Sequence, residues 1–262
     1  MAARKKSRLL IASTTSIQNS GLLDVLIPAY EKSTRYDVKV EVIAVGTGKA
    51  IRTAKQGEAD MLFVHDPFRE EKFVVEGYGV NRRAVMHNHF VILGPAGDPA
   101  GAGGAKNAVE AFELIAETGS QFVSRGDDSG TNIKELDLWE AAGINPKGKG
   151  WYSETGGKMG DTLLAAGRKK AYTLSDAGTF LNYESRLKLK ILCGGGEPLM
   201  KNPYSVIAVN PDRFPGARYR EAMDFIAFVT SAEGQKTIAG HVRHGSRLFY
   251  PDAVPSVIAS AR

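Results

Sequence analysis

Short apolar runs alternate with segments of helical periodicity along most of this chain. Residues 8–12, 38–45 and 61–64 have the length and residue types of strands. Between the first two runs, apolar residues from 22 to 30 recur at the spacing of one helix face. Alternation of this kind is typical of an α/β fold, and it predicts a mainly parallel sheet.

The pattern continues beyond a clear change in composition. Residues 94–104 are rich in glycine, which indicates either a long loop or a crossing between domains. We interpret the β-branched run at residues 204–209 as the return crossing. The remaining pattern predicts strands at residues 83–86, 90–93 and 171–174, and helices at residues 68–76, 106–118, 161–165, 218–229 and 232–239.

Three loops of small hydroxyl residues and glycine precede predicted helices. They contain Ser13-Thr14-Thr15-Ser16, Gly46-Thr47-Gly48 and residues 124–131. In open α/β sheets, ligands bind beyond the carboxyl ends of strands, where such loops converge. Small side chains there expose backbone N–H donors, so three such loops indicate an anion pocket.

The third loop also carries a permanent cation. Arg125 precedes Ser129-Gly130-Thr131, and a helical pattern follows through Trp139. The first N–H groups of a helix lack partners, and a guanidinium fork suits a tetrahedral oxyanion. The alternative is an ordinary helix start with Asp128 or Ser129 as N-cap.

Two nucleotide-binding motifs fail on this sequence. A P-loop ending at Gly48-Lys49 would need a glycine at Ile43 and a Ser or Thr at Ala50. A dinucleotide fingerprint starting at Gly46 would need a glycine at Ile51. We therefore expect no nucleotide cofactor.

Composition narrows the function classes further. The 262 residues, 43% of them hydrophobic, suffice for one large or two modest domains. The net charge of +5 suits an anionic ligand, but no basic stripe with interleaved aromatic residues indicates a nucleic-acid partner. No apolar run approaches the roughly 20 residues that span a bilayer.

The N-terminus and the single cysteine bear on location. Residues 1–6 resemble the charged start of a signal peptide, but only residues 9–12 follow as an apolar run. We expect either a cytoplasmic protein or one whose export signal has been removed. Cys193 is alone, which excludes an intrachain disulfide and predicts a small buried or loop residue.

An enzyme is the alternative from another class. Ser129, His65 and an aspartate are the residue types of a hydrolytic triad, but no nucleophile-elbow sequence is present. The pairs His87 with His89 and His241 with His244 lack the third and fourth ligands that zinc sites use. We expect no catalytic residue, no metal site and no cofactor.

Seven short motifs together are more specific than any single loop. They are Ser13-Thr14-Thr15-Ser16, Val45-Gly46-Thr47-Gly48, Val64-His65-Asp66-Pro67, residues 124–131, Ala171-Tyr172-Thr173-Leu174, Asn202-Pro203-Tyr204 and Val209-Asn210-Pro211. In these motifs the chain resembles the tungstate-binding proteins of ABC-type transporters, from about residue 9 to the last predicted helices. Arg125 with Ser129-Gly130-Thr131 is also similar to a motif of phosphate-binding transport proteins.

The resemblance implies the two-lobed periplasmic binding protein fold of type II, with a ligand cleft between the lobes. Residues 1–93 and 204–262 would form the lobe with both chain ends, and residues 94–203 the inserted lobe. It also implies an extracytoplasmic monomer that delivers its ligand to a membrane permease. A ligand-sensing domain of a regulator would share this fold, but the chain has no separate helix-turn-helix module.

The resemblance assigns ligand donors to both lobes. The first lobe would contribute Thr15, Ser16, Thr47 and Gly48. The second would contribute Arg125, Ser129, Gly130 and Thr131, with Ser175 as a weaker candidate.

The protonation state of the anion decides which side chains the site needs. Tungstate, molybdate and sulfate are fully deprotonated at neutral pH and need only donors. Monoprotonated phosphate also needs an acceptor, which Asp66 would supply if it faced the ligand. Spacing leaves the direction of Asp66 open, and Asp127 and Asp128 either accept from the ligand, cap the helix or orient Arg125. The fuller motif set favours tungstate, with molybdate, phosphate or sulfate as the alternative.

Overall fold

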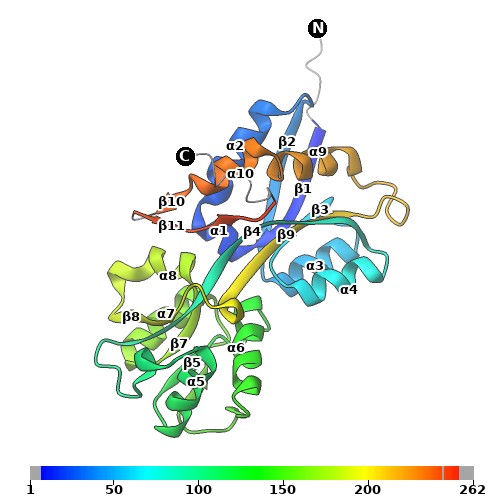
Figure 1. The fold of residues 1–262 in the computed structure, drawn as a ribbon. Helices are drawn as coiled ribbons and strands as arrows, with labels where there is room; N and C mark the ends of the chain where they lie inside the picture. The colour runs from blue at the N-terminus through cyan, green and yellow to red at the C-terminus, as the bar shows by residue number, and fades with distance from the viewer. Residues whose placement is uncertain (1–6, 244, 254–262) are drawn as a thin grey trace. The chain divides into compact units, whose positions relative to one another are not determined.

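The computed structural model describes residues 7–243 and 245–253 of the chain. The chain divides into two compact units. Unit 1 comprises residues 1–87 and 203–262, and unit 2 comprises residues 88–202. Strands and helices alternate in both units, which confirms the predicted α/β class (Figure 1).

Unit 1 is built on three parallel strands. The central strand β1 (Ser7–Thr14) pairs with β2 (Val38–Val45) on one side and with β3 (Met61–Val64) on the other. The strand β9 (Lys201–Val209) continues the sheet antiparallel to β3. The strands β4 (Gly79–Pro95) and β12 (Tyr250–Pro251) follow, in the order β12-β4-β9-β3-β1-β2.

Helices cover the two faces of this sheet (Figure 1). They are α1 (Thr15–Ser20), α2 (Leu22–Ser33), α3 (Thr47–Lys55), α4 (Pro67–Val75), α9 (Tyr219–Val229) and α10 (Ala232–Ala239). Ala50 of α3 and Phe73 of α4 pack with Leu62 and Ile207 of the sheet in one core cluster. The helices α2, α9 and α10 pack together on the other face. A short ribbon of β10 (Val242–Arg243) and β11 (Ser246–Arg247) follows α10.

Unit 2 has its own sheets and core. The second part of β4 pairs antiparallel with β7 (Thr173–Asp176) and β8 (Leu189–Gly194), and β5 (Phe122–Ser124) pairs in parallel with β6 (Tyr152–Glu154). Its helices are α5 (Ala108–Glu117), α6 (Gly130–Ala141), α7 (Met159–Lys169) and α8 (Ala177–Tyr183), with 3-10 turns η1 (Ala102–Gly104), η2 (Glu184–Arg186) and η3 (Pro198–Met200). Phe112, Phe122 and Trp139 form an aromatic centre, with the Phe112 and Trp139 ring centroids 4.3 Å apart.

The sheets are mixed, because the chain passes between the units along strands. Apart from the β10–β11 ribbon, the antiparallel pairs in the described residues all involve β4 or β9. The division of the chain falls inside these strands, after His87 and after Asn202. The sequence places the first crossing later, at the glycine-rich stretch, but β4 continues to Pro95 and that stretch follows it as a loop.

Two predicted strands, at residues 83–86 and 90–93, are one continuous strand. The polar residues between them interrupt the apolar pattern, yet His87 pairs with Tyr250 and Phe90 pairs with Asp176. The strands β8, β10, β11 and β12 were not among the predicted elements. Within the described part of the chain, no helix is both long enough and apolar enough to cross a bilayer.

Candidate anion-binding loops

The first hydroxyl loop lies where β1 ends. Ser13 and Thr14 are the last residues of β1, and Thr15 begins α1. Because Thr14 lies opposite Val45 in the parallel register, this helix start is adjacent to the loop that follows β2. Ser16 Oγ lies 2.9 Å from Thr14 Oγ1 and 3.2 Å from His65 Nε2, so its hydroxyl already belongs to a hydrogen-bond network.

The second loop presents donors without partners. Thr47 is 1% exposed, and its Oγ1 has no hydrogen-bond partner among the described residues. Thr47 and Gly48 are the first two residues of α3, whose N-cap Gly46 provides no side-chain cap. A Cβ added at Gly46 would meet no atom within 4 Å, so there is open space before the helix start. An uncapped helix start with a buried free hydroxyl suits an anion.

Asp66, after β3, turns toward its own helix. Its Oδ1 accepts a hydrogen bond from the Arg69 N–H at 3.0 Å, which makes it the N-cap of α4. Its Oδ2 lies 3.5 Å from Arg69 Nε as an ion pair, without hydrogen-bond geometry. In this structure the Asp66 charge is therefore balanced by Arg69 and the start of α4.

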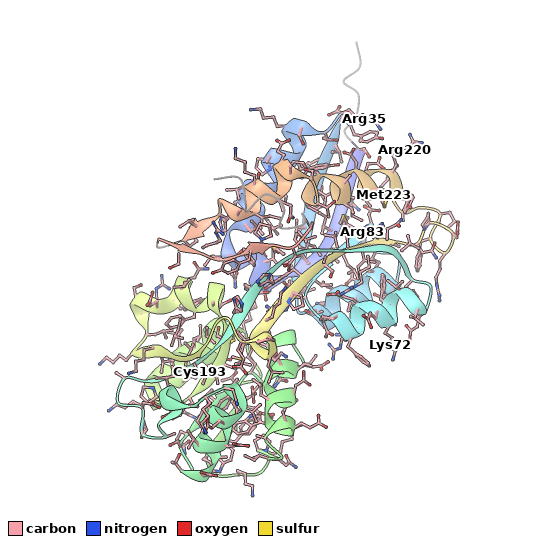
Figure 2. All side chains as sticks on the ribbon, in the orientation of Figure 1. Arg35, Lys72, Arg83, Cys193, Arg220 and Met223 are labelled. Carbon is pink, nitrogen blue, oxygen red and sulfur yellow. The ribbon has the colours of Figure 1, made fainter. Side chains whose placement is uncertain are left out.

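A buried ion pair holds the segment that contains Asp66. The fully buried Glu70 accepts from the Asp66 N–H at 2.8 Å and from Arg82 Nε and Nη2, each at 2.8 Å. Burial raises the pKa of the Glu70 carboxyl, and the Arg82 charge partly offsets that rise. The next residue, Arg83, is exposed and projects from β4 (Figure 2).

In unit 2, Arg125 is a buried cation with unused donor capacity. Its side chain is 10% exposed, and its Nη2 lies 2.5 Å from Asp127 Oδ2. Its Nε has no hydrogen-bond partner in residues 7–243 and 245–253. Asp127 Oδ1 also accepts from the Ser129 N–H at 3.2 Å, so Asp127 orients Arg125 and ties it to the helix start.

Ser129, Gly130 and Thr131 form the start of α6. Ser129 is the N-cap, as one alternative from the sequence predicts, and its Oγ accepts from the Asn132 N–H at 3.3 Å. A hydroxyl that accepts with its oxygen still has a proton to donate. Gly130 is the first helical residue, and Thr131 is buried.

A buried carboxyl, that of Glu135 in α6, lies next to this loop. Glu135 Oε1 accepts from Tyr152 Oη at 2.8 Å and from Trp139 Nε1 at 3.2 Å, and Ser124 lies close enough to lower the pKa of this carboxyl. Ser124 Oγ in turn accepts from the Gly126 N–H at 3.1 Å and from Asn132 Nδ2 at 3.2 Å. Burial raises the pKa of Glu135 to about 7. Sequence reasoning missed Glu135, although its spacing to Leu138 and Trp139 puts it on the buried helix face.

Ser175 differs from the other predicted donors. It is fully buried in β7, and its hydroxyl donates to the Asp176 carbonyl at 2.9 Å. Asp176 Oδ1 caps α8 by accepting from the Thr179 N–H at 2.9 Å. The Ser175 proton is therefore already used, which makes it the weakest of the predicted ligands.

The residues of the rival interpretations have other roles. His65 Nε2 lies 3.2 Å from Ser16 Oγ, and its ring packs at a tilt of 36° against the Tyr204 ring, with centroids 4.7 Å apart. His87 Nδ1 lies 2.9 Å from both Asp252 carboxylate oxygens, and His241 Nε2 lies 2.8 Å from the Ser20 carbonyl. His244, the partner of His241 in the second predicted metal pair, lies outside the described residues.

Metal ligation and thiol chemistry find no support in the described residues. No group of three or more His, Cys, Asp or Glu side chains there could hold a metal ion. Cys193 lies half-buried on β8 in unit 2 (Figure 2). Burial raises the pKa of its thiol, and Glu197 adds to the rise, which disfavours the reactive thiolate.

The predicted donors thus fall into one group in each unit. In unit 1, the parallel register brings the starts of α1 and α3 together at one sheet edge, with Thr15, Ser16, Thr47 and Gly48. In unit 2, Arg125 and Ser129-Gly130-Thr131 are consecutive parts of one loop and helix start. Chemically, both groups are rich in donors; Asp127 is paired with Arg125, and Asp66 caps α4 with one of its two oxygens.

Known proteins share this fold and sequence. Residues 2–233 match the PBP superfamily domain. The chain is 42% identical over 252 residues to a tungstate-binding protein TupA of Peptoclostridium acidaminophilum, covering 95% of this chain and 87% of that protein. It is also similar to the solved tungstate-binding protein TupA of Desulfovibrio alaskensis G20, with 40% identity, coverage of 95% and 100%, and a TM-score of 0.85.

A third relative extends the same likeness. The solved tungstate ABC transporter protein of Geobacter sulfurreducens shares 50% identity, covers 88% of this chain and 97% of its own, and gives a TM-score of 0.80. These relatives are named for binding and transport and not for catalysis. The chain therefore belongs to the PBP superfamily and, within it, to the family of the TupA tungstate-binding proteins.

Proposed function

We propose that this protein is the solute-binding component of an ABC importer, and that it captures tungstate and delivers it to a membrane permease. The names of the TupA relatives support the ligand and the transporter. The proposed contacts are the hydroxyl and N–H donors of Thr15, Ser16, Thr47 and Gly48 in unit 1, and Arg125, Ser129, Gly130 and Thr131 in unit 2. Ser175 contributes least, because its hydroxyl donates to Asp176.

The single observation that supports an anion most directly is the state of Arg125. Arg125 is a buried residue, 9% exposed, whose Nε has no hydrogen-bond partner among the described residues, so its buried cation still has a donor available. An unsatisfied buried polar group is costly, and charge-assisted hydrogen bonds to an oxyanion would remove that cost. The buried, unpartnered Thr47 hydroxyl supports the same conclusion in unit 1.

The donor-rich composition favours a fully deprotonated dianion over monoprotonated phosphate. A bound phosphate O–H would need an acceptor; Asp127 pairs with Arg125, and Asp66 caps α4 with Oδ1 and forms an ion pair with Arg69 through Oδ2, which accepts no hydrogen bond from the described residues. A further free carboxylate near a dianion would repel it in a partly dry site. We therefore place tungstate first, and molybdate, sulfate and phosphate as the alternative ligands.

On this proposal, a bound tungstate ion stabilises the form of the protein in which the donors reach it, so ligand shifts the population toward that form. A permease that recognises this form would then bind the protein preferentially when it carries tungstate. The same proposal places the protein outside the cytoplasm, as a monomer with no nucleic-acid partner.

Competition calorimetry with tungstate, molybdate, sulfate and phosphate across neutral pH tests this function. We expect tungstate to bind most tightly, with an affinity that stays nearly constant across the pH range in which phosphate changes from monoanion to dianion. If phosphate bound most tightly, and its affinity changed with its protonation state, the protein would be a phosphate-binding protein. No measurable binding of any of the four anions would contradict the anion site itself.

A further inference from the structure

Unit 2 contains a hollow of about 790 Å³ that none of the proposed tungstate ligands lines. Three segments form its walls: the loop at residues 95–99 after β4, the C-terminal half of α7, and residues 186–188 before β8. Figure 1 shows α7 and β8 within the same unit. The residues that line this hollow are therefore separate from those of the candidate anion-binding loops.

The walls of this hollow are apolar. Pro95 and Pro99 line it from the loop, Leu164 from α7, and Leu187 from the segment before β8. Gly167 of α7 leaves room on the helix face, because a Cβ there would meet only Leu187 Cδ2 at 3.5 Å and the Lys188 nitrogen at 4.0 Å. Such walls suit an apolar body and offer no advantage to a bare inorganic ion.

Four cations surround these walls. Arg168 and Lys170 come from the end of α7, and Arg186 and Lys188 from the segment before β8. All four are exposed, and none of them forms a salt bridge within residues 7–243 and 245–253. No acidic residue lines the hollow, so its positive potential is not neutralised locally.

We propose that this hollow binds an amphipathic organic anion, a small molecule with an apolar body and a carboxylate, sulfonate or phosphate head. The volume lies within the range of small-molecule sites, roughly 300–1,000 Å³. The apolar walls would take the body, and the cations would hold the head near solvent. A hollow of this size suits a small molecule better than a protein partner, since stable protein interfaces bury about 800 Å² on each side.

The test uses the full chain and the fluorescent sulfonate 8-anilinonaphthalene-1-sulfonate. We expect saturable binding at one site, displacement by decanoate, and no displacement by decanol or inorganic sulfate. Saturable binding of the uncharged analogue N-phenyl-1-naphthylamine with equal affinity would show that the cations have no role, and would overturn the proposal.

Matched variants locate the site. We expect Arg168→Glu with Lys188→Glu to weaken sulfonate binding roughly tenfold or more, because two attractions become repulsions. The control reverses two exposed lysines of unit 2 that do not line the hollow, Lys147→Glu with Lys149→Glu, and should leave binding unchanged. If both double variants lost the same sulfonate affinity, the effect would come from the net charge of the protein and not from this site, which would overturn the proposal.

A filling variant tests the volume independently of charge. Gly167→Leu places a side chain on the helix face that lines the hollow, and leucine favours a helix more than glycine does. We expect unchanged or higher thermal stability, loss of sulfonate binding and unchanged tungstate affinity. Retained sulfonate binding in this folded variant would overturn the proposal. Stronger displacement by an acidic, leucine-containing peptide than by decanoate would also overturn it, in favour of a protein segment.

Discussion

Arg125 combines burial, one carboxylate partner and an unpaired Nε in a single side chain. Asp127 holds the guanidinium in place by accepting from both Arg125 and the Ser129 N–H. A charge fixed in this way reaches a ligand without the entropic cost of ordering a mobile side chain. Removing it would also leave Asp127 uncompensated near a dianion.

At this scale we predict that Arg125→Ala weakens tungstate binding more than Thr15→Ala does. A charge-assisted hydrogen bond contributes about 1.5–3 kcal/mol, so the arginine variant should lose roughly ten- to over a hundredfold in affinity. A neutral hydroxyl contributes about 1 kcal/mol, roughly fivefold. Ser175→Ala is the control and should bind almost as the parent does, because its hydroxyl donates to Asp176. Titration calorimetry that reverses the order of Arg125 and Thr15 would refute their assigned roles.

Individual residues also show what spacing leaves undetermined. Residue types at the loops after strands direct attention to Thr47 and Arg125, and the structure gives each of them a buried polar atom without a hydrogen-bond partner among the described residues. The direction of Asp66 was not predictable, because it depends on the Arg69 N–H and on the backbone that Glu70 fixes. The network at Glu135 was missed for a similar reason, since Tyr152, which bonds it, comes from a separate strand.

At the scale of elements, α6 presents its start to the anion-binding loop and its buried face to Glu135. Ser124 accepts from the Gly126 N–H and from Asn132 of α6, so buried hydrogen bonds join the helix to the loop, and Glu135 lies beside them. Burial is the main cause of the raised pKa of Glu135, and the charge of Glu154 adds to it. The folded protein therefore holds this proton to a higher pH than the unfolded chain does.

The raised pKa of Glu135, about 7, predicts a pH dependence of stability. Between the unfolded pKa of roughly 4.5 and the folded value, the native state binds more protons, so stability falls as pH rises through this window. The loss should approach about 3 kcal/mol above the folded pKa. Urea unfolding at intervals across this range should show the decline in the parent protein and a smaller decline in Glu135→Gln, which keeps an acceptor oxygen. An equal decline in both proteins would contradict the assignment.

The sequence predicted helices and strands correctly where the apolar residues of a segment followed a single pattern, either a continuous run or helical spacing. Apolar runs gave β1, β3 and β9, and helical spacing gave α9 and α10. The strand β4 was divided in two, because a strand that crosses between units has polar residues at the crossing. The strand β8 was missed; Lys190 interrupts its apolar residues, and Gly194-Gly195-Gly196 follow at once.

At the scale of the whole molecule, unit 2 is one continuous segment and unit 1 is made of two. The core residues of unit 2, around Phe112, Phe122 and Trp139, all lie within residues 88–202. A second cluster around Leu163 and Phe180 lies there as well. The part of β4 from Phe90 to Pro95 pairs only with β7 and β8 in the registers described, so unit 2 completes its own sheet.

We predict that a fragment of residues 88–202 folds on its own. Its cores and its β4 pairings are internal, so urea should unfold it in one cooperative transition with a circular dichroism spectrum of mixed α/β type. A matched fragment of residues 1–87 lacks β9, which extends its sheet, and should not show such a transition. A fragment 88–202 that melts without cooperativity would show that the unit depends on the rest of the chain.

The hydrogen bond between Asn202 Nδ2 and Asn88 Oδ1, at 2.8 Å, joins the two places where the chain passes into and out of unit 2. Because these places are neighbours, the whole segment is a cassette with adjacent ends. A recombination event could exchange it for the same segment of a relative, or replace it with a short bridge, without lengthening the remaining backbone. Such an exchange would replace all the proposed donors of unit 2 at once, so that ligand preference could change in a single step.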